Sequence, residues 1–448
     1  MAEKFHFECV DCQSEYPGNQ VIYLCPSCDQ DNNPGEPPRG VLKTVYEYDK
    51  IRGLAPSAQL FDHLRMGHYL PLMPIREWSS WPVLRVGDTP MYKWTGGRAD
   101  GRTGGQADKR TGGQADKRTG GQVDEWTVGI DGGGAEVFLK DDSQNPTFSF
   151  KDRASALVSA WAKENGITNL VAASTGNAGS SLAGICASQG QQAMIVVPAA
   201  APLAKLTQIL MYGARLVPVK GTYDDAFDLS VQISAKYGFY NRNTAFNPLT
   251  IEGKKTVSFE IFEQCGHRVP DRIFIPVGDG VIYSGVCKGF EDLLLLGITD
   301  RMPVLVAVQA QGSANLIANL GNSGSFISTP SKTVADSISV NVPRCFRMTE
   351  SYMKKYQGES IAVSDREILD ASVKLSHSAG IFSEPAAVAA FAGMLLYRSQ
   401  GKLHPGSKNV VLLTGSGLKD LTAVQSSISI PDAVEPELSS VELILNHS

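Results

Sequence analysis

The stretch NPTFSFKDR, residues 145–153, holds one lysine between two phenylalanines and an acid–base pair. A lysine that acts as a Schiff-base nucleophile must be partly desolvated, so that its amine can be neutral. Phe148 and Phe150 would supply an apolar wall for that amine, and Pro146 stiffens the approach to it. Most lysines, however, only cover surface with their stems. The stretch therefore marks Lys151 as a candidate nucleophile whose role depends on the rest of the chain.

Length and composition describe an ordinary soluble globular protein. The chain has 448 residues, 42% hydrophobic and 19% charged, which is enough for two or three domains and a sizeable core. Its net charge of −5 argues against nucleic acid or an anionic membrane as the main partner. No apolar run approaches the ~20 residues of a membrane span, and the first residues have no signal-peptide core. We expect a cytoplasmic protein.

Four cysteines are clustered near the start of the chain. Cys9-x-x-Cys12 is followed, after twelve residues, by Cys25-x-x-Cys28. Two such pairs can place four thiolates at the corners of a tetrahedron, as structural zinc prefers. Thiol–disulfide chemistry is the rival interpretation, but the paired spacing favours metal. Because Lys4 is the only lysine or arginine in residues 1–33, we predict a structural zinc ribbon at 1–32 rather than a nucleic-acid module.

The region between the ribbon and the lysine stretch has two unlike parts. Residues 33–90 begin with a proline-rich linker and continue as an arm with a strand-like segment at 41–48. Residues 95–126 repeat TGGRADGR, TGGQADKR, TGGQADKR and TGGQVDEW with a period of eight. The repeat has almost nothing to bury, and its lysines and arginines disfavour a calcium-binding array. We predict a disordered insertion there.

Beyond the lysine stretch, strand and helix patterns alternate. Strands with nearly continuous apolar residues, separated by helices, indicate a parallel α/β sheet. The patterns predict strands at 136–140, 170–173, 193–197, 215–219, 272–277, 304–308 and 410–413, and helices at 154–165, 180–189, 204–212 and 223–237. We expect two α/β units with a site between them. The catalytic region spans 91–430, its smaller subdomain roughly 165–265, and a tail follows at 431–448.

Three glycine-containing loops follow predicted strands, where open α/β folds bind ligands. They are STGNAGSS at 174–181, VGDGVI at 277–282 and TGSGLKD at 414–420. The first two open helical patterns, so free N–H groups would favour an anion there. No GxGxxG fingerprint supports a dinucleotide. Anion cradles, a desolvated lysine and a hydroxyl-bearing loop instead match the needs of pyridoxal phosphate.

These motifs resemble the fold-type II pyridoxal-phosphate enzymes and, within them, the threonine synthases. That family's NPTGSFKDR appears here as NPTFSFKDR, its STGN loop as residues 174–177, its EPA segment as 384–386 and its TGxGLKD end as 414–420. The resemblance runs from about Gly87 to Asp420, leaving out the repeat. It implies two doubly wound α/β domains with the cofactor in the cleft between them, beside a small zinc ribbon.

The resemblance also implies residue roles. Lys151 would bond the cofactor and act as the acid–base catalyst, Asn177 would contact the cofactor's phenolic oxygen, and Thr414 would face its ring nitrogen. Ser174 and Thr175 would lie near the substrate carboxylate. The cofactor phosphate would be held by the backbone of Gly278, Asp279, Gly280, Val281 and Ile282.

The implied enzyme is a lyase that converts O-phospho-L-homoserine and water to threonine and phosphate, as a homodimer. The alternative is β-elimination or β-replacement on serine, threonine or a phosphorylated amino acid, since the same fold supports both. A second class is a zinc-ribbon interaction protein whose α/β body only binds a metabolite.

Three departures from the family pattern concern the substrate. Phe148 stands where glycine is usual, and the loop at 278–282 replaces a GNxGN sequence. Thr250 stands where threonine synthases often have an arginine for the substrate phosphate. Lys254 or Lys255, a turn further along, is our candidate replacement for that cation.

Overall fold

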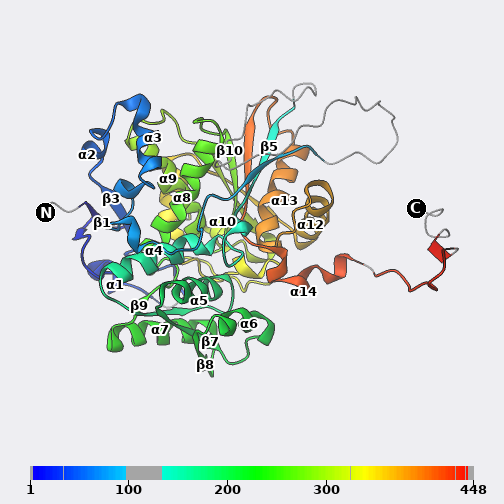
Figure 1. Cartoon of the computed structure of the whole chain (residues 1–448), viewed down its shortest axis with the longest axis horizontal. Coiled ribbons are helices and arrows are strands. Elements are labelled where there is room, and N and C mark those ends of the chain that lie inside the picture. Colours follow the sequence, from blue (N-terminus) through cyan, green and yellow to red (C-terminus); the bar gives the residue numbers. More distant parts are fainter. Residues whose placement is uncertain are drawn as a thin grey trace.

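The structure, a computed structural model, describes residues 4–33, 35–96, 134–322, 324–428, 430–438 and 440–441. The repeat predicted as a disordered insertion therefore lies outside the described residues, apart from its first two. Among the described helices, none is long and apolar enough to cross a membrane. Figure 1 shows a smaller α/β unit at the bottom of the view, a larger one above it, and the N-terminal arm beside the larger unit.

The larger unit is built on a six-stranded sheet with the order β12-β11-β10-β13-β5-β4. Its strands are β4 (Met91–Trp94), β5 (Glu136–Asp141), β10 (Arg272–Pro276), β11 (Val304–Ala310), β12 (Glu359–Val363) and β13 (Lys408–Leu413). All neighbouring pairs are parallel except β4 with β5. The predicted strands of this unit are confirmed. The antiparallel edge strand β4 was missed because its four residues, MYKW, are too few to show alternation.

The smaller unit is a four-stranded parallel sheet with the order β8-β7-β6-β9. Its elements are β6 (Asn169–Ala173), α5 (Asn177–Gln189), β7 (Gln192–Pro198), α6 (Leu203–Met211), β8 (Arg215–Val219), α7 (Tyr223–Tyr237) and β9 (Tyr240–Asn241). The predicted helices and strands of this unit are confirmed, and α7 and β8 have the predicted limits. Helix α7 begins there because Thr222 and Asp225 form a capping box.

Three helices form the centre of the molecule: α4 (Lys151–Glu164), α8 (Leu249–Gln264) and α9 (Val281–Leu295). The backbones of α4 and α8 approach closely at Gly253, where an added Cβ would lie 2.8 Å from the Cα of Ala154. Helix α8 was not predicted. It is buried on almost every side, so its sequence has no amphipathic period.

The remaining helices complete the larger unit and its C-terminal end. They are α10 (Asn315–Asn319), α11 (Phe346–Lys355), α12 (Asp365–Ala379), α13 (Pro385–Ser399) and α14 (Leu421–Val424). Helices α12 and α13 lie on the same side of the sheet in Figure 1. Their apolar residues Ile368, Leu375, Val388 and Phe391 pack in one core with the strands β11 and β13.

A buried ion cluster fixes the start of α4. The guanidinium of Arg153 binds Asp142 (2.7 Å) and Glu260 (2.6 Å), and Lys140 binds Glu260 (2.6 Å). Burial opposes ionisation, but the charges of Arg153 and Lys140 hold the pKa of Glu260 well below its usual range. A carboxylate with two cations and several hydrogen bonds is the arrangement that makes buried charge tolerable. The cluster therefore ties α4 and β5 to α8 directly behind Lys151.

The N-terminal region is joined to this core through tyrosines. It contains β1 (Phe5–Cys9), β2 (Glu15–Pro17), α1 (Pro26–Asp29), β3 (Leu42–Tyr46), α2 (Tyr48–Arg52) and α3 (Ser57–Met66), and β2-β1-β3 form an antiparallel sheet. The predicted strand-like segment at 41–48 thus contains β3. Tyr46 donates a hydrogen bond to Glu252 (2.8 Å) and Tyr48 to Asp292 (2.6 Å). The acceptors belong to α8 and α9, so the small sheet is anchored to the central helices.

Candidate active site

The predicted site segments follow the carboxyl ends of parallel strands. Residues 174–176 follow β6, residues 277–280 follow β10, and residues 414–416 follow β13. Lys151 begins α4, after the turn that leaves β5. The carboxyl ends of parallel strands are where α/β folds place ligand-binding loops. The expectation that these loops serve one site is therefore consistent with the topology of both sheets.

Backbone hydrogen bonds join the lysine stretch to the loop after β13. The N–H of Phe150 donates to the carbonyl of Thr414 (2.8 Å), and the N–H of Ser416 donates to the carbonyl of Phe148 (3.0 Å). Ser149 and Gly415 form an isolated antiparallel bridge between these two bonds. These bonds place the backbone of Thr414 next to the residues that precede Lys151, although the two residues are far apart in the sequence.

Asn177, at the start of α5 in the smaller unit, is linked through Glu384 to the loop after β13. Its side-chain amide donates to both carboxylate oxygens of Glu384, at 2.8 and 3.0 Å. The backbone N–H of Glu384 donates to the carbonyl of Gly415 (3.1 Å). A Cβ at Gly415 would lie 2.5 Å from the carboxylate, so a larger residue there would displace the Glu384 side chain from Asn177. Sequence reasoning used Glu384 only as part of the EPA segment and missed this buried carboxylate as a site residue.

The amine of Lys151 is in an environment that favours its neutral form. Burial lowers the pKa of Lys151, the charge of Glu384 raises it, and the charge of Arg242 lowers it again. Among the described residues, none forms an ion pair with this amine within 4 Å. A lysine with a lowered pKa is the form that can attack a carbonyl carbon. The sequence-based expectation of a desolvated lysine is thus consistent with the structure.

The two phenylalanines predicted to form an apolar wall for the amine of Lys151 differ in burial. Phe150 is fully buried, whereas Phe148 is 48% exposed. The structure thus buries one of the two rings that were predicted as an apolar wall, and the role of Phe148 beside the amine stays a prediction. Its backbone has a φ of 67°, in the left-handed region that glycine adopts without strain. Glycine would adopt this backbone conformation more readily than phenylalanine does.

The loop at residues 278–282 forms a backbone cradle at the start of α9. Gly280 has a φ of 87°, and a Cβ at Gly278 would lie 2.9 Å from the Cα of Ile338. The first N–H groups of a helix have no intrahelical acceptor and favour an anion. Asp279 does not oppose this use, because its carboxylate accepts a hydrogen bond from the backbone of Arg344 (3.1 Å). The acidic side chain is thereby held toward α11.

The assembled groups fit pyridoxal phosphate. The cofactor needs a lysine for its aldehyde, N–H donors for its phosphate and polar partners for its ring. Lys151, the cradle at 278–282, Asn177 and Thr414 supply these chemical types. The hydroxyl of Ser149, two residues before the lysine, is buried and has no hydrogen-bond partner among the described residues. Ser174 and Thr175 lie in the short loop between β6 and Asn177, so they approach the site from the smaller unit.

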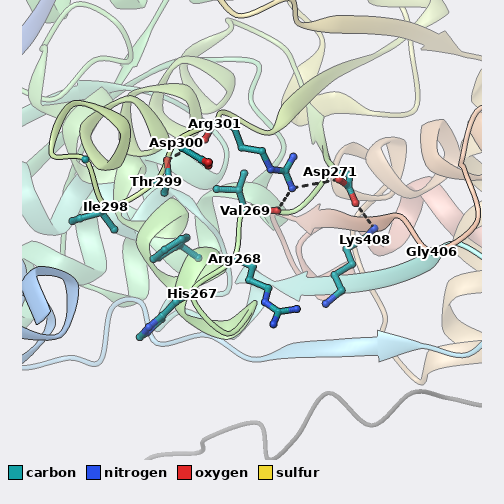
Figure 2. A pocket seen from close by; sticks show the side chains of 12 residues that line it. His267, Arg268, Val269, Asp271, Ile298, Thr299, Asp300, Arg301, Gly406 and Lys408 are labelled. Atoms are coloured by element: carbon teal, nitrogen blue, oxygen red, sulfur yellow. Dashed lines mark hydrogen bonds and ion pairs between the residues drawn. The ribbon is translucent and has the colours of Figure 1, made fainter. Parts of the chain in front are cut away.

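A separate surface pocket lies at the opposite ends of the strands (Figure 2). Its volume is about 720 Å³, and none of the residues predicted for the site lines it. Asp271 organises it by binding Arg301 (3.3 Å) and the backbone N–H of Lys408 (2.8 Å). These residues precede β10 and β11 and begin β13. We interpret them as the structural connection between three strand starts.

Comparisons with known proteins define the class. A family model described as "Pyridoxal-phosphate dependent enzyme" matches residues 130–415. The chain therefore belongs to the pyridoxal-phosphate-dependent enzyme family, of fold type II. Among its relatives, a threonine synthase of Methanosarcina acetivorans is 30% identical, and one of Methanocaldococcus jannaschii is 29% identical, each match covering 98% of both chains. A threonine synthase of Synechocystis is 37% identical over 68% of this chain and 78% of its own.

Solved structures share the fold at lower identity. A processed threonine deaminase isoform from Solanum lycopersicum aligns with a TM-score of 0.57 and 23% identity, covering 66% of this chain and 84% of its own. An O-ureido-L-serine synthase aligns with a TM-score of 0.57 and 18% identity, covering 81% and 97%. These likenesses support the architecture of the two α/β units and carry no substrate assignment.

The contact between Asn177 and Glu384 leads to a prediction about Lys151. Replacing Glu384 by glutamine removes a negative charge that raises the pKa of the lysine. The pKa of Lys151 should then fall further, so the neutral amine persists to lower pH. We expect the pH midpoint for the rate at which apoenzyme takes up pyridoxal phosphate, followed by absorbance, to move to lower pH in Glu384→Gln.

Ser337→Ala is the matched control. The Ser337 hydroxyl also donates to Glu384, at 3.3 Å, but its loss removes no charge. Its midpoint should stay at the wild-type value. A midpoint that rises in Glu384→Gln, or that moves equally in both variants, would contradict the assigned electrostatics.

Proposed function

We propose that this enzyme is a threonine synthase, converting O-phospho-L-homoserine and water to L-threonine and phosphate. The observation that carries the proposal is the match to proteins of that name, which covers 98% of this chain and 98% of each relative. The site geometry supports it, because the chemistry requires one mobile proton acceptor beside an anion-binding cradle.

The proposed roles follow from the positions of the side chains. Pyridoxal phosphate, when bound, supplies an electron sink that stabilises negative charge on the substrate's α-carbon. The neutral amine of Lys151 removes the proton from that carbon and later returns it. Burial suits the amine to this role because it lowers the pKa toward neutrality. Ser174 and Thr175, in the loop before α5, orient the substrate carboxylate.

Three further elements hold the cofactor. The backbone N–H groups at 278–282 bind its phosphate. Asn177 donates to its phenolic oxygen once one of the two hydrogen bonds to Glu384 is released. Thr414 offers a neutral hydroxyl to the ring nitrogen and is fixed by the hydrogen bond between its carbonyl and Phe150. A neutral partner leaves the ring nitrogen without the full positive charge that an aspartate would enforce.

The activity is tested by incubating the holoenzyme with O-phospho-L-homoserine in ¹⁸O-labelled water. We expect phosphate and threonine in equal amounts, with the label in the threonine hydroxyl. Lys151→Ala should reduce the rate by at least about 10²–10⁴-fold, the contribution of a positioned acid–base group.

O-phosphoserine, L-serine and L-threonine are the comparison substrates. Deamination of serine or threonine by the wild-type enzyme, without phosphate release from O-phospho-L-homoserine, would replace the proposal with a β-elimination enzyme. A holoenzyme that converts none of the four substrates would favour the metabolite-binding alternative.

We also propose that Cys9, Cys12, Cys25 and Cys28 bind one structural zinc ion. All four are free thiols whose sulfur atoms lie within 4.8 Å of one another. The sulfurs of Cys12 and Cys25 are 3.5 Å apart and those of Cys9 and Cys28 are 3.8 Å apart. Separations of this size match the edges of a tetrahedral site with four thiolates. Cys9 ends β1, Cys12 lies in the turn before β2, and Cys25 and Cys28 lie at α1, so the cluster is far from Lys151 in the chain.

Metal analysis of the purified protein checks this proposal. We expect about one zinc per chain, lost when Cys25 and Cys28 are both replaced by serine, with a lower melting temperature because metal binding contributes folding free energy. Cys186→Ala, at a buried thiol outside the cluster, should keep its zinc. Disulfides among the four cysteines in protein kept under reducing conditions would refute the site.

A further inference from the structure

The buried cations of the protein fall into two groups. Four of the six most deeply buried ones have a carboxylate within 4.0 Å: Arg153, Lys140, Lys255 and Lys288. The other two, Arg242 and Lys254, have no such partner among the described residues, although each is at most 1% exposed. Buried charges are normally paired because removing them from water is costly. No carboxylate therefore binds Arg242 or Lys254 directly, although the charge of Asp152 acts on Arg242, and that of Asp279 on Lys254, from a greater distance.

Arg242 contacts the start of α4. It follows β9, and its three nitrogens donate to Ser155 Oγ (3.0 Å), Thr244 Oγ1 (3.3 Å) and the carbonyl of Lys151 (3.4 Å). All three acceptors are neutral, so none compensates the guanidinium charge. The last acceptor places the guanidinium beside the backbone of the candidate catalytic lysine.

Lys254 lies on α8 where this helix meets α9. Its stem packs against Gly285, where an added Cβ would lie 2.7 Å from the Cβ of Lys254. Gly285 follows the start of α9 by one turn, so this contact is close to the cradle at 278–282. Within the described part of the chain, the amine donates to one acceptor, the carbonyl of Thr250 (3.1 Å). The neighbouring Lys255 cannot serve instead, because Glu252 and Asp292 (2.7 Å) already bind it.

Lys254 and Thr250 are neighbours on the surface of α8. Side chains four residues apart lie on the same face of an α-helix, and Lys254 reaches back toward Thr250. Thr250 itself is fully buried and uses its hydroxyl to bind the carbonyl of Asn247 (2.7 Å). The Lys254 amine thus lies on the same face of α8 as Thr250.

The two cations and Lys151 share one electrostatic environment. Burial lowers the pKa of Lys254 most, and the charges of Arg242 and Lys151 lower it further. Arg242 likewise lowers the pKa of Lys151. The other charges that act on Lys254 are Cys345 and Asp279, which raise its pKa. A bound dianion would offset the charge of Arg242 and favour the protonated form of Lys254.

We propose that Arg242 and Lys254 bind the phosphate monoester of the substrate. This inference rests on the proposed function, which requires a phosphorylated amino acid. The cofactor phosphate is assigned to the cradle after β10, in the larger unit, whereas Arg242 approaches from the end of the smaller sheet. Two cations at one phosphate also provide the electrostatic stabilisation that a departing phosphate needs.

The test measures binding of inorganic phosphate to the holoenzyme, by calorimetry and by the rise in melting temperature. Lys254→Met keeps the volume and removes the charge, and Arg242→Gln removes the other charge. Each should weaken phosphate binding by at least about tenfold, as expected for a lost hydrogen bond between charged groups. In Lys254→Met, the affinity for pyridoxal phosphate and for L-homoserine, which lacks the phosphate, should stay within about twofold of wild type.

Lys255→Met is the matched control on the same helix. Its loss leaves Glu252 and Asp292 with one cation fewer, so the melting temperature without phosphate should fall while phosphate affinity is retained. Lys254→Met should show the opposite behaviour, since it removes a buried and unpaired charge. Should Arg242→Gln fail to fold, Arg242→Lys keeps the charge and should keep most of the phosphate affinity.

The outcomes separate the two proposals. Unchanged phosphate affinity in both Lys254→Met and Arg242→Gln, or no phosphate binding by wild type, would overturn the inference. A loss of affinity for pyridoxal phosphate instead would assign the pair to the cofactor and also overturn it. If wild type releases no phosphate from O-phospho-L-homoserine yet binds phosphate through Lys254, the proposed reaction fails while the phosphate monoester site remains.

Discussion

The hydrogen bonds between the lysine stretch and the loop after β13 are the constraint on which the candidate site depends. They link the backbones of Phe150 and Thr414, and of Phe148 and Ser416. Through them the first turn of α4 is held at the carboxyl end of the strand at the centre of the larger sheet. Glu384 joins the same backbone through Gly415 and carries Asn177 from the smaller unit. Residues from both units therefore meet around one lysine.

Charge pairing distinguishes the scaffold from the site. Behind Lys151, the ion cluster of Arg153, Asp142, Glu260 and Lys140 is fully paired, and it holds α4 rigidly against α8. Three basic groups near the site differ from this cluster. The amines of Lys151 and Lys254 and the guanidinium of Arg242 have no carboxylate partner within 4 Å among the described residues. Proteins tolerate unpaired buried charge chiefly where function uses it. Helix α4 therefore has two roles: Arg153 anchors it to α8 through ion pairs, and Lys151 supplies the reactive amine.

Much of the fold could be predicted because local patterns agree with it. The strands and helices of the smaller unit show clear apolar runs and helical spacing, and Thr222 with Asp225 marks the start of α7. Helix α8 could not be predicted, since burial on all sides removes the amphipathic period. For the site, glycine loops and the lysine stretch were visible in the sequence. The roles of Glu384 and Arg242 could not be predicted from the sequence, because they depend on contacts between residues that are distant in the chain.

The central claim is that Lys151 is the residue that bonds the cofactor. The most direct test is to reduce the holoenzyme with sodium borohydride, which makes the link to the lysine permanent, and to map the modified peptide by mass spectrometry. The account predicts a single modified lysine, Lys151, with the buried amines of Lys140, Lys254, Lys255 and Lys288 unmodified. Modification of any of those lysines in place of Lys151, or a protein that retains no cofactor after reduction, would contradict it.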